Sequence, residues 1–259
     1  MSYSRSPKSD TPNLAPPSPG WKKDLVDPGR HFVYTISHTP IKLNFKSRIF
    51  LEIRRSSLSI RGLAALFGFL FLLLVPVLIY LLVNGWATIG ISSKASAILM
   101  LPIILWIAVI ALRIDLETPL NEPIRFNYAR QKLYAYNFKF CHWAAWRPWP
   151  IRIVIYDWPQ VRAELWSTGS GTRNRCGIML SIVKLGTNRV IDRFPLNYNN
   201  ASEDPWLYIH TYMEKGPDAL PPFDTPRDPN ELVWYSPFRR WAPKVKWPED
   251  IDRESTTAP

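Results

Sequence analysis

The chain has 259 residues, a net charge of +11 at pH 7 and only two cysteines, which excludes a disulfide-stapled secreted domain. The positive charge is unevenly distributed. The first 61 residues carry eleven Lys and Arg against four acids, whereas residues 113–259 carry twenty bases against seventeen acids. A nucleic-acid-binding protein concentrates its charge on the folded domain, so this distribution argues against nucleic acid and favours anionic membrane headgroups as the partner.

The N-terminal part of the chain divides into two segments. Residues 1–30 begin with a Ser- and Pro-rich stretch and are expected to form a disordered N-terminal tail. Residues 31–60 form a basic cytoplasmic segment in which apolar and polar side chains alternate, and this alternation predicts short strands. Whether residues 31–55 join a sheet formed later in the chain stays open. The alternative is a basic amphipathic segment lying on the inner leaflet.

Two apolar runs follow, separated by a short segment. The first, at residues 61–83, and the second, at 95–112, are each long enough to cross a hydrocarbon layer of about 30 Å, the second only just. Both runs are apolar all round, whereas helices buried in soluble proteins usually show a polar stripe. The sequence therefore predicts a transmembrane hairpin with a short periplasmic loop at residues 84–94.

The charges that flank the hairpin predict its orientation. The loop carries Lys94 alone, whereas the segment before the hairpin is rich in Lys and Arg. By the positive-inside rule, both termini face the cytoplasm. The sequence thus predicts a multi-pass membrane protein with both termini in the cytoplasm and with reduced thiols.

The remainder of the chain predicts one small folded unit and a tail. Residues 119–217 contain short runs rich in Val, Ile, Tyr and Trp, bounded by turn residues, which is typical of an antiparallel sheet curled into a small barrel or sandwich. Residues 202–215 predict a single helix that closes this β-domain. Residues 218–259 form a Pro-rich aromatic and basic tail. The predicted fold class is an α+β membrane protein.

Two aromatic and basic clusters are candidate contact sites. Residues 142–150 place three tryptophans at intervals of three around an arginine, and the tail repeats this chemistry. Trp and Arg are enriched both in membrane interfaces and in protein interfaces, although a small barrel also uses Trp as core. Both readings stay open, as does whether the tail docks on the domain, the membrane or a partner. The candidate residues are Trp143, Trp146, Arg147, Trp149, Arg239, Arg240 and Trp241.

No constellation predicts catalysis. Cys141 and His142 are neighbours, and neighbours in a strand point to opposite faces. The cysteines and histidines lack metal-ligand spacing, and the Gly/Ser loop at residues 167–171 precedes a strand, so no helix N-terminus is available for phosphate. Three acids, Asp157, Glu164 and Asp192, lie near arginines and predict surface ion pairs. We therefore expect no enzyme activity, no cofactor and no metal.

The order of elements carries a resemblance. The stretches PIRFNYARQKLYAY and YMEKGPDALP, together with the hairpin, resemble an uncharacterised family of proteobacterial two-helix membrane proteins associated with type VI secretion effector genes. The likeness covers roughly residues 31–222. A strand meander closed by one helix is also similar to bacterial pleckstrin-homology-like domains, and this second likeness is architectural only.

Two functions are consistent with these features. The first is a non-enzymatic inner-membrane protein that acts by protein recognition, and the resemblance implies an immunity or accessory factor for a membrane-targeting type VI effector. The alternative is a scaffold or sensor that binds anionic lipid through residues 42–61 and the β-domain. In both, the chain is integral to the lipid membrane and binds no nucleic acid. The sequence leaves the identity of the protein partner and the oligomeric state open.

Overall fold

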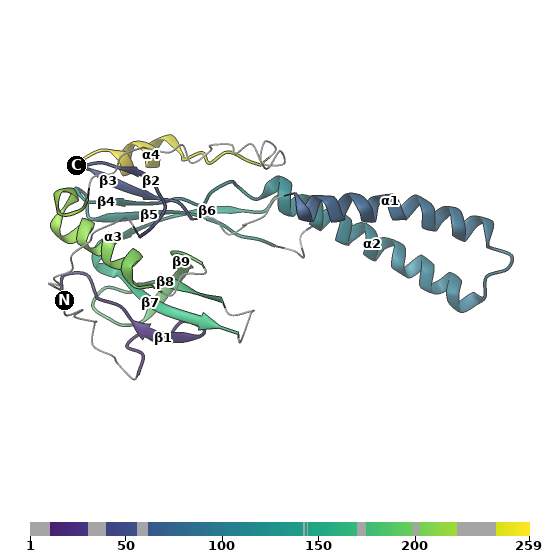
Figure 1. The fold of residues 1–259 in the computed structure, drawn as a ribbon, viewed down its shortest axis with the longest axis horizontal. Helices are drawn as coiled ribbons and strands as arrows, with labels where there is room; N and C mark the ends of the chain where they lie inside the picture. Colours follow the sequence, from purple (N-terminus) through teal and green to yellow (C-terminus); the bar gives the residue numbers. More distant parts are fainter. Residues whose placement is uncertain are drawn as a thin grey trace.

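The computed structural model describes residues 11–30, 40–55, 62–141, 143, 145–169, 175–198, 202–221 and 242–259. The chain is an α+β protein, as predicted. Figure 1 shows two long helices that leave one end of a β-rich domain side by side and form a hairpin. The first helix, α1, spans Leu63–Asn84, and the second, α2, spans Ile91–Glu117.

Both helices of the hairpin are long and apolar enough to cross a membrane. In the most apolar stretch of each helix only 6% of the residues are buried, because the hairpin projects away from the domain (Figure 1). Helix α2 continues beyond the apolar run predicted at 95–112, since Arg113 and Glu117 pair at 2.6 Å one turn apart and support its last turn. The segment between the helices is shorter than the loop predicted at 84–94, because α2 already begins at Ile91.

The two helices approach closely at Gly68. A Cβ atom at this position would lie 2.8 Å from Cγ of Leu112 and 2.9 Å from the carbonyl oxygen of Ala108. A small residue here lets the backbones of α1 and α2 pack together without a steric clash, as small residues do in membrane helix pairs.

The β-domain contains two antiparallel sheets. The four-stranded sheet has the order β1-β7-β8-β9, with β1 at Trp21–Asp24, β7 at Val161–Thr168, β8 at Arg175–Val183 and β9 at Val190–Pro195. The five-stranded sheet has the order β2-β3-β4-β5-β6, with β2 at Leu43–Lys46, β3 at Phe50–Ile53, β4 at Ile124–Asn127, β5 at Lys132–Phe138 and β6 at Ile151–Asp157.

The strands before the hairpin join the sheets formed after it. Strand β3 pairs with β4 from Phe50 opposite Asn127 to Ile53 opposite Ile124, so residues 40–55 contribute strands to the sheet formed after the hairpin, whereas residues 31–39 lie outside the described residues. Strand β1 pairs with β7, although the sequence predicted disorder through residue 30. A four-residue strand with two lysines gains order from the backbone of its neighbour, which local sequence does not reveal.

Of the two predicted alternatives, a barrel or a sandwich, the closed barrel is wrong, because no backbone ladder joins the two sheets in the described part of the chain. The edge strands β6 and β9 meet through side chains instead. Asp192 accepts a hydrogen bond of 2.7 Å from the Tyr156 hydroxyl and pairs with Arg152 at 3.1 Å. This polar contact bridges the two edges without main-chain pairing, so two separate sheets share one core.

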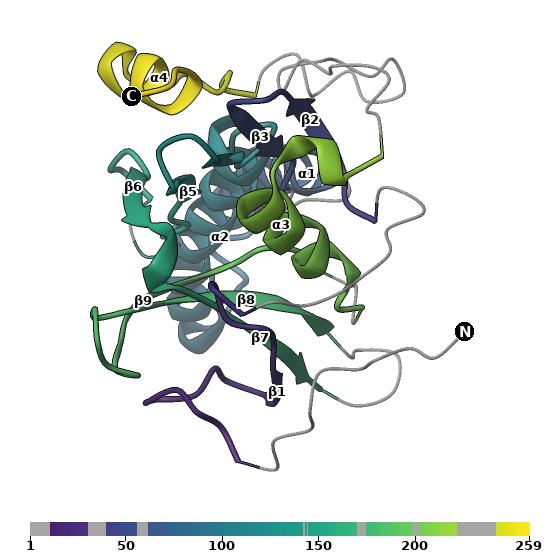
Figure 2. The ribbon, with the colours of Figure 1, turned by 90° about the vertical axis from the view of Figure 1, so that its left-hand side faces the viewer.

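Helix α3, at Asp204–Lys215, completes that core. It lies between the two sheets in Figure 2 and corresponds in sequence to the helix predicted at 202–215. Trp206, Ile209 and Met213, which lie at helical spacing, are each at most 1% exposed. Residues 205–213 are buried all round, since the N-terminal segment also covers the helix: the indole nitrogen of Trp206 donates to the carbonyl oxygen of Val26 at 2.8 Å.

The C-terminal part of the predicted tail is ordered. Helix α4, at Glu249–Thr256, docks on the five-stranded sheet at the end of the domain away from the hairpin (Figure 1). Asp252 pairs with Arg125 at 2.6 Å, and Glu254 pairs with Lys132 at 3.0 Å. Short 3-10 turns at Trp158–Gln160 and Pro217–Ala219 complete the described elements.

Candidate functional site

The candidate site lies at the base of the hairpin, where α2 meets the loop between β5 and β6. The guanidinium of Arg113 holds this loop, since it donates to the carbonyl oxygen of Ala145 and, at 2.6 Å, to that of Arg147. The same guanidinium forms a bidentate pair with Glu117. The end of α2 thereby fixes the backbone of the tryptophan-rich loop against the hairpin.

Two of the predicted tryptophans project from this loop. Trp143 is 76% exposed and Trp146 is 79% exposed. The Trp143 ring packs edge-on against Trp106 of α2, with ring centroids 5.9 Å apart. Trp106 lies seven residues before Arg113, about 10 Å along the helix axis, so the loop reaches along the apolar part of the hairpin. Arg147 is also exposed.

The third tryptophan of the loop packs inside the domain. Trp149 is 5% exposed, and its ring lies 4.7 Å from that of Phe140. The Arg113 guanidinium lies 4.8 Å from the centre of the Trp149 ring, a cation–π contact. Each of the two hypotheses for this stretch, core or contact surface, therefore holds for part of it: Trp149 is buried in the core, whereas Trp143 and Trp146 lie on the surface.

The other predicted contact residues, Arg239, Arg240 and Trp241, lie outside the described residues. The last tryptophan of the tail does lie within them. Trp247 packs on the β-domain, with the Arg125 guanidinium 4.6 Å from its ring and the Tyr136 ring 5.6 Å away. For this part of the tail, docking on the domain is the arrangement that forms.

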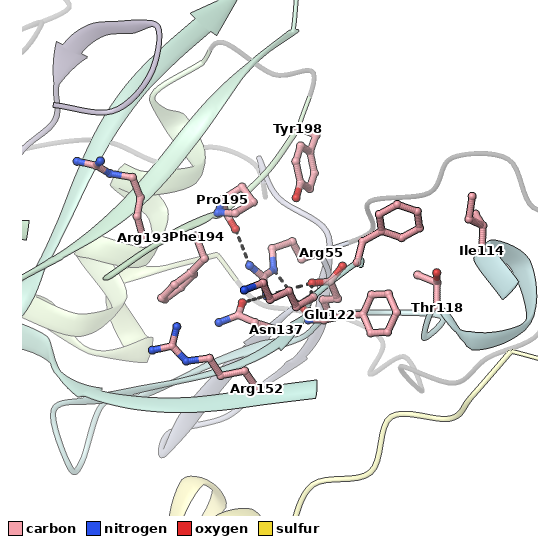
Figure 3. A pocket seen from close by; sticks show the side chains of 13 residues that line it. Arg55, Ile114, Thr118, Glu122, Asn137, Arg152, Arg193, Phe194, Pro195 and Tyr198 are labelled. Carbon is pink, nitrogen blue, oxygen red and sulfur yellow. Dashed lines mark hydrogen bonds and ion pairs between the residues drawn. The ribbon is translucent and has the colours of Figure 1, made fainter. Parts of the chain in front are cut away.

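Beside the tryptophan-rich loop, a pocket of about 560 Å³ opens between the base of the hairpin and the two sheets (Figure 3). Its residues come from the end of α2, the end of β5, the start of β6, the end of β9 and the segment after β3. The residues that line it are Arg55, Ile114, Thr118, Glu122, Asn137, Phe138, Lys139, Phe140, Arg152, Arg193, Phe194, Pro195 and Tyr198.

Arg55 forms the floor of this pocket and ties its walls together. Its guanidinium donates to the carbonyl oxygens of Glu122 at 3.0 Å, Pro195 at 2.8 Å and Tyr136 at 3.0 Å, and to the side-chain oxygen of Asn137 at 2.6 Å. The Glu122 carboxylate lies 3.9 Å away. Burial lowers the pKa of Arg55, and Glu122 opposes that shift by stabilising the charge.

Two of the three acids predicted to form surface ion pairs, Asp192 and Glu164, pair with arginines beside this site, and Glu164 does so in the interior. Arg152 pairs with Asp192 at an exposed position, as expected. Glu164 is 0% exposed and accepts hydrogen bonds from Ser181 and, at 2.9 Å, from the backbone nitrogen of Ser18. Arg193 lies 3.3 Å from the same carboxylate, so the buried charge is compensated.

His142 lies outside the described residues, so the pair it forms with Cys141 is not placed. Among the described residues, no group of three His, Cys, Asp or Glu lies close enough to hold a metal ion. Sequence reasoning missed the pocket, because Arg55, Glu122 and Arg193 are far apart in the chain and carry no motif.

Comparisons with known proteins add one match. The sequence model described as "Family of unknown function (DUF6708)" matches residues 101–259. No curated protein and no solved structure matches the chain. The matched region contains most of α2, the β-domain after the hairpin and the C-terminal helix.

Proposed function

We propose that this chain, which belongs to the DUF6708 family of unknown function, is a non-enzymatic integral membrane protein that recognises another protein at the bilayer surface. The observation that carries the proposal is the exposed tryptophan pair held at the base of the hairpin. Trp143, Trp146 and Arg147 present the side chains that dominate both protein interfaces and membrane boundaries, and Arg113 fixes their backbone.

The hairpin supports the membrane part of the proposal. Its two helices expose apolar side chains along most of their length, and contact of so large an apolar surface with water would be unfavourable. Arg113 ends the apolar run of α2, and Lys94 lies at the opposite end of the hairpin. With eleven bases before α1, both termini face the cytoplasm of a bacterial inner membrane.

The protein partner in this proposal is an effector of a type VI secretion system. The resemblance of the hairpin and of the stretch PIRFNYARQKLYAY implies an immunity or accessory factor for a membrane-targeting effector. A recognition surface at the base of a membrane hairpin lies where an inserting pore former must pass. The pleckstrin-homology-like character of the β-domain is part of the same proposal.

The membrane placement is tested first. The protein should remain in the membrane pellet after alkaline carbonate extraction, and a reporter that is active only in the cytoplasm should be active when fused after Pro259. Release by carbonate, or a reporter active only in the periplasm, would contradict the placement.

Recognition is tested with an effector encoded beside the gene. Cells that lack the gene should become sensitive to that effector, and the wild-type chain should restore resistance. The double variant Trp143→Ala/Trp146→Ala should fail to restore it while reaching the same abundance in the membrane. If cells without the gene stay fully resistant, the immunity function is wrong.

A second candidate function is an anionic-lipid scaffold or sensor. It is favoured by the pocket at the base of the hairpin, whose lining carries four bases and one acid. The two functions differ in what occupies this end of the domain: a protein on the tryptophan-rich loop, or a lipid headgroup in the pocket.

A further inference from the structure

The pocket lies at the end of α2, beyond the apolar run of the hairpin. Ile114 and Thr118, at the end of α2, form one wall, and they follow directly after the residue that ends the apolar run. If the hairpin spans the bilayer as proposed above, the pocket opens at the boundary between hydrocarbon and water. A volume of about 560 Å³ falls within the ordinary range for small-molecule sites.

The charges of the lining favour an anion. Arg55, Lys139, Arg152 and Arg193 contribute four positive charges against the single carboxylate of Glu122. Two of the arginines form ion pairs with acids that do not line the pocket, Arg152 with Asp192 and Arg193 with Glu164, and these acids partly neutralise their charge. Lys139 is exposed, and its ammonium forms no ion pair among the described residues. Together with these two partners, the group keeps a net positive charge.

The apolar part of the lining gives the pocket two chemically different sides. Phe138, Phe140 and Ile114 lie toward the hairpin, and Phe140 is 44% exposed. Figure 3 shows Arg152 and Arg193 on the side of the two sheets, flanking Phe194, with the Arg55 network between. A ligand that matches both sides carries an anionic group and an apolar portion.

We propose that this pocket binds the phosphate diester of an anionic membrane phospholipid. Lys139 and Arg152, the two most accessible cations of the lining, contact the phosphate oxygens, and Arg55 holds the floor in place. Phe140 and Ile114 cover the glycerol and the first acyl carbons. The lipid enters from the leaflet that surrounds the hairpin, so it need not leave the membrane. The same phosphate chemistry could come from a soluble phosphate ester, which the test separates.

The test measures lipid binding by the full-length chain in detergent micelles, using native mass spectrometry. The probes are dioleoyl phosphatidylglycerol and dioleoyl phosphatidylcholine. We expect one phosphatidylglycerol to be retained in preference to phosphatidylcholine. The variant Lys139→Gln/Arg152→Gln should weaken phosphatidylglycerol binding about tenfold, which corresponds to about 1.4 kcal/mol. Lys184→Gln, which removes an exposed lysine outside the pocket, is the matched control and should behave as wild type.

Two further measurements keep the result interpretable. The single variant Lys139→Gln removes a charge without disturbing an ion pair, so it should weaken binding even if the double variant loses stability. Competition with soluble glycerol 3-phosphate identifies the source of the phosphate. No competition supports the lipid, whereas competition as effective as that of the lipid would overturn the lipid and assign a soluble phosphate ester.

Equal retention of both lipids, or equal losses in Lys139→Gln and Lys184→Gln, would overturn the pocket as an anion site. This inference rests on the proposed membrane placement, but the two can fail separately. Carbonate extraction reports on the hairpin, while the comparison of Lys139→Gln with Lys184→Gln in micelles reports on the pocket whether or not a bilayer is present.

Discussion

The Asp115 carboxylate accepts a hydrogen bond of 2.7 Å from the backbone nitrogen of Ala65. Asp115 lies in the last turn of α2, and Ala65 lies in the first turn of α1, where backbone N–H groups have no partner within the helix. One helix of the hairpin therefore caps the other at the point where both join the β-domain. Asp115 is 1% exposed, so water does not replace the bond.

Removing this cap should loosen the base of the hairpin. We expect Asp115→Ala to lower the free energy of unfolding by about 1–2 kcal/mol, because the Ala65 amide loses its acceptor in a buried place. Asp115→Asn keeps a side-chain oxygen and should lose less. Thermal unfolding in detergent, followed by circular dichroism, measures both. Equal losses in the two variants would show that the hydrogen bond is not the cause.

Two tryptophans of one loop should respond differently to truncation. Trp149→Ala removes a buried ring and should destabilise the protein by about 3–5 kcal/mol. Trp143→Ala removes a ring that is 76% exposed and should cost less than about 1 kcal/mol. Thermal unfolding compares them directly. A loss in Trp143→Ala as large as that in Trp149→Ala would contradict the division of the loop into core and surface.

The exposed tryptophans should sit in the membrane boundary. With Cys141 and Cys176 replaced by Ser, a fluorophore attached at Trp146→Cys should be quenched by lipids that carry a quencher near the headgroup. The same fluorophore at Asp250→Cys, an exposed position on α4 at the far end of the domain, should not be quenched. Equal quenching at the two positions would contradict this placement.

His210 should make stability depend on pH. Burial lowers the pKa of His210 below its usual 6.5, and the ring contacts the carbonyl oxygen of Asp27 at 3.0 Å. Because the unfolded chain binds the proton more readily, the contribution of His210 is present above pH 6.5 and is lost as the pH falls below that value. His210→Gln should flatten the change in unfolding free energy between about pH 5 and about pH 7. An unchanged slope would contradict this role.

The C-terminal helix should detach when its acidic contacts are removed. Hydrogen bonds from Lys132 and Tyr134 lower the pKa of Glu254, so this carboxylate favours docking above its ordinary pKa and loses that effect in acid. Asp252→Asn/Glu254→Gln should speed hydrogen exchange across Glu249–Thr256. Asp250→Asn, an exposed acid on the same helix, should leave exchange unchanged. Fast exchange in both variants would mean that helix stability, not docking, is altered.

The sequence predicted those elements whose cause is local. The hairpin follows from two uninterrupted apolar runs, and α3 follows from Pro205 near its start and the spacing of its apolar residues. Strand β1 was missed because Lys22 and Lys23 have low strand preference and the strand depends on β7 for partners. The predicted barrel is wrong at β6 and β9, because the side chain of Asp192 bridges these two edge strands in place of backbone pairing.

The candidate site was partly predictable for the same reason. The tryptophan-rich loop is visible as a composition, but which of its rings is buried depends on Arg113 and on the end of β5. The pocket could not be predicted, because five segments meet there and none has a motif. In the sequence, Arg55 is one of several bases that precede the first apolar run. In the fold it is 3% exposed, and it donates hydrogen bonds to the carbonyl oxygens of Pro195 in one sheet and Tyr136 in the other.

The direct pairing of β3 with β4 has a consequence for biosynthesis. The two strands are neighbours in the sheet, and the backbone nitrogen of Glu122 still donates to the carbonyl oxygen of Arg55 at 2.9 Å just beyond the ladder. In the sequence, residues 54–123 separate the two strands, and most of these residues belong to the hairpin. Strand β3 is therefore translated early together with its other neighbour β2, and its edge on the β4 side stays unpaired until both helices and then β4 have been synthesised. With the membrane placement proposed above, the hairpin is synthesised and inserted before the five-stranded sheet closes, and a chain that stalls at this stage exposes an open sheet edge.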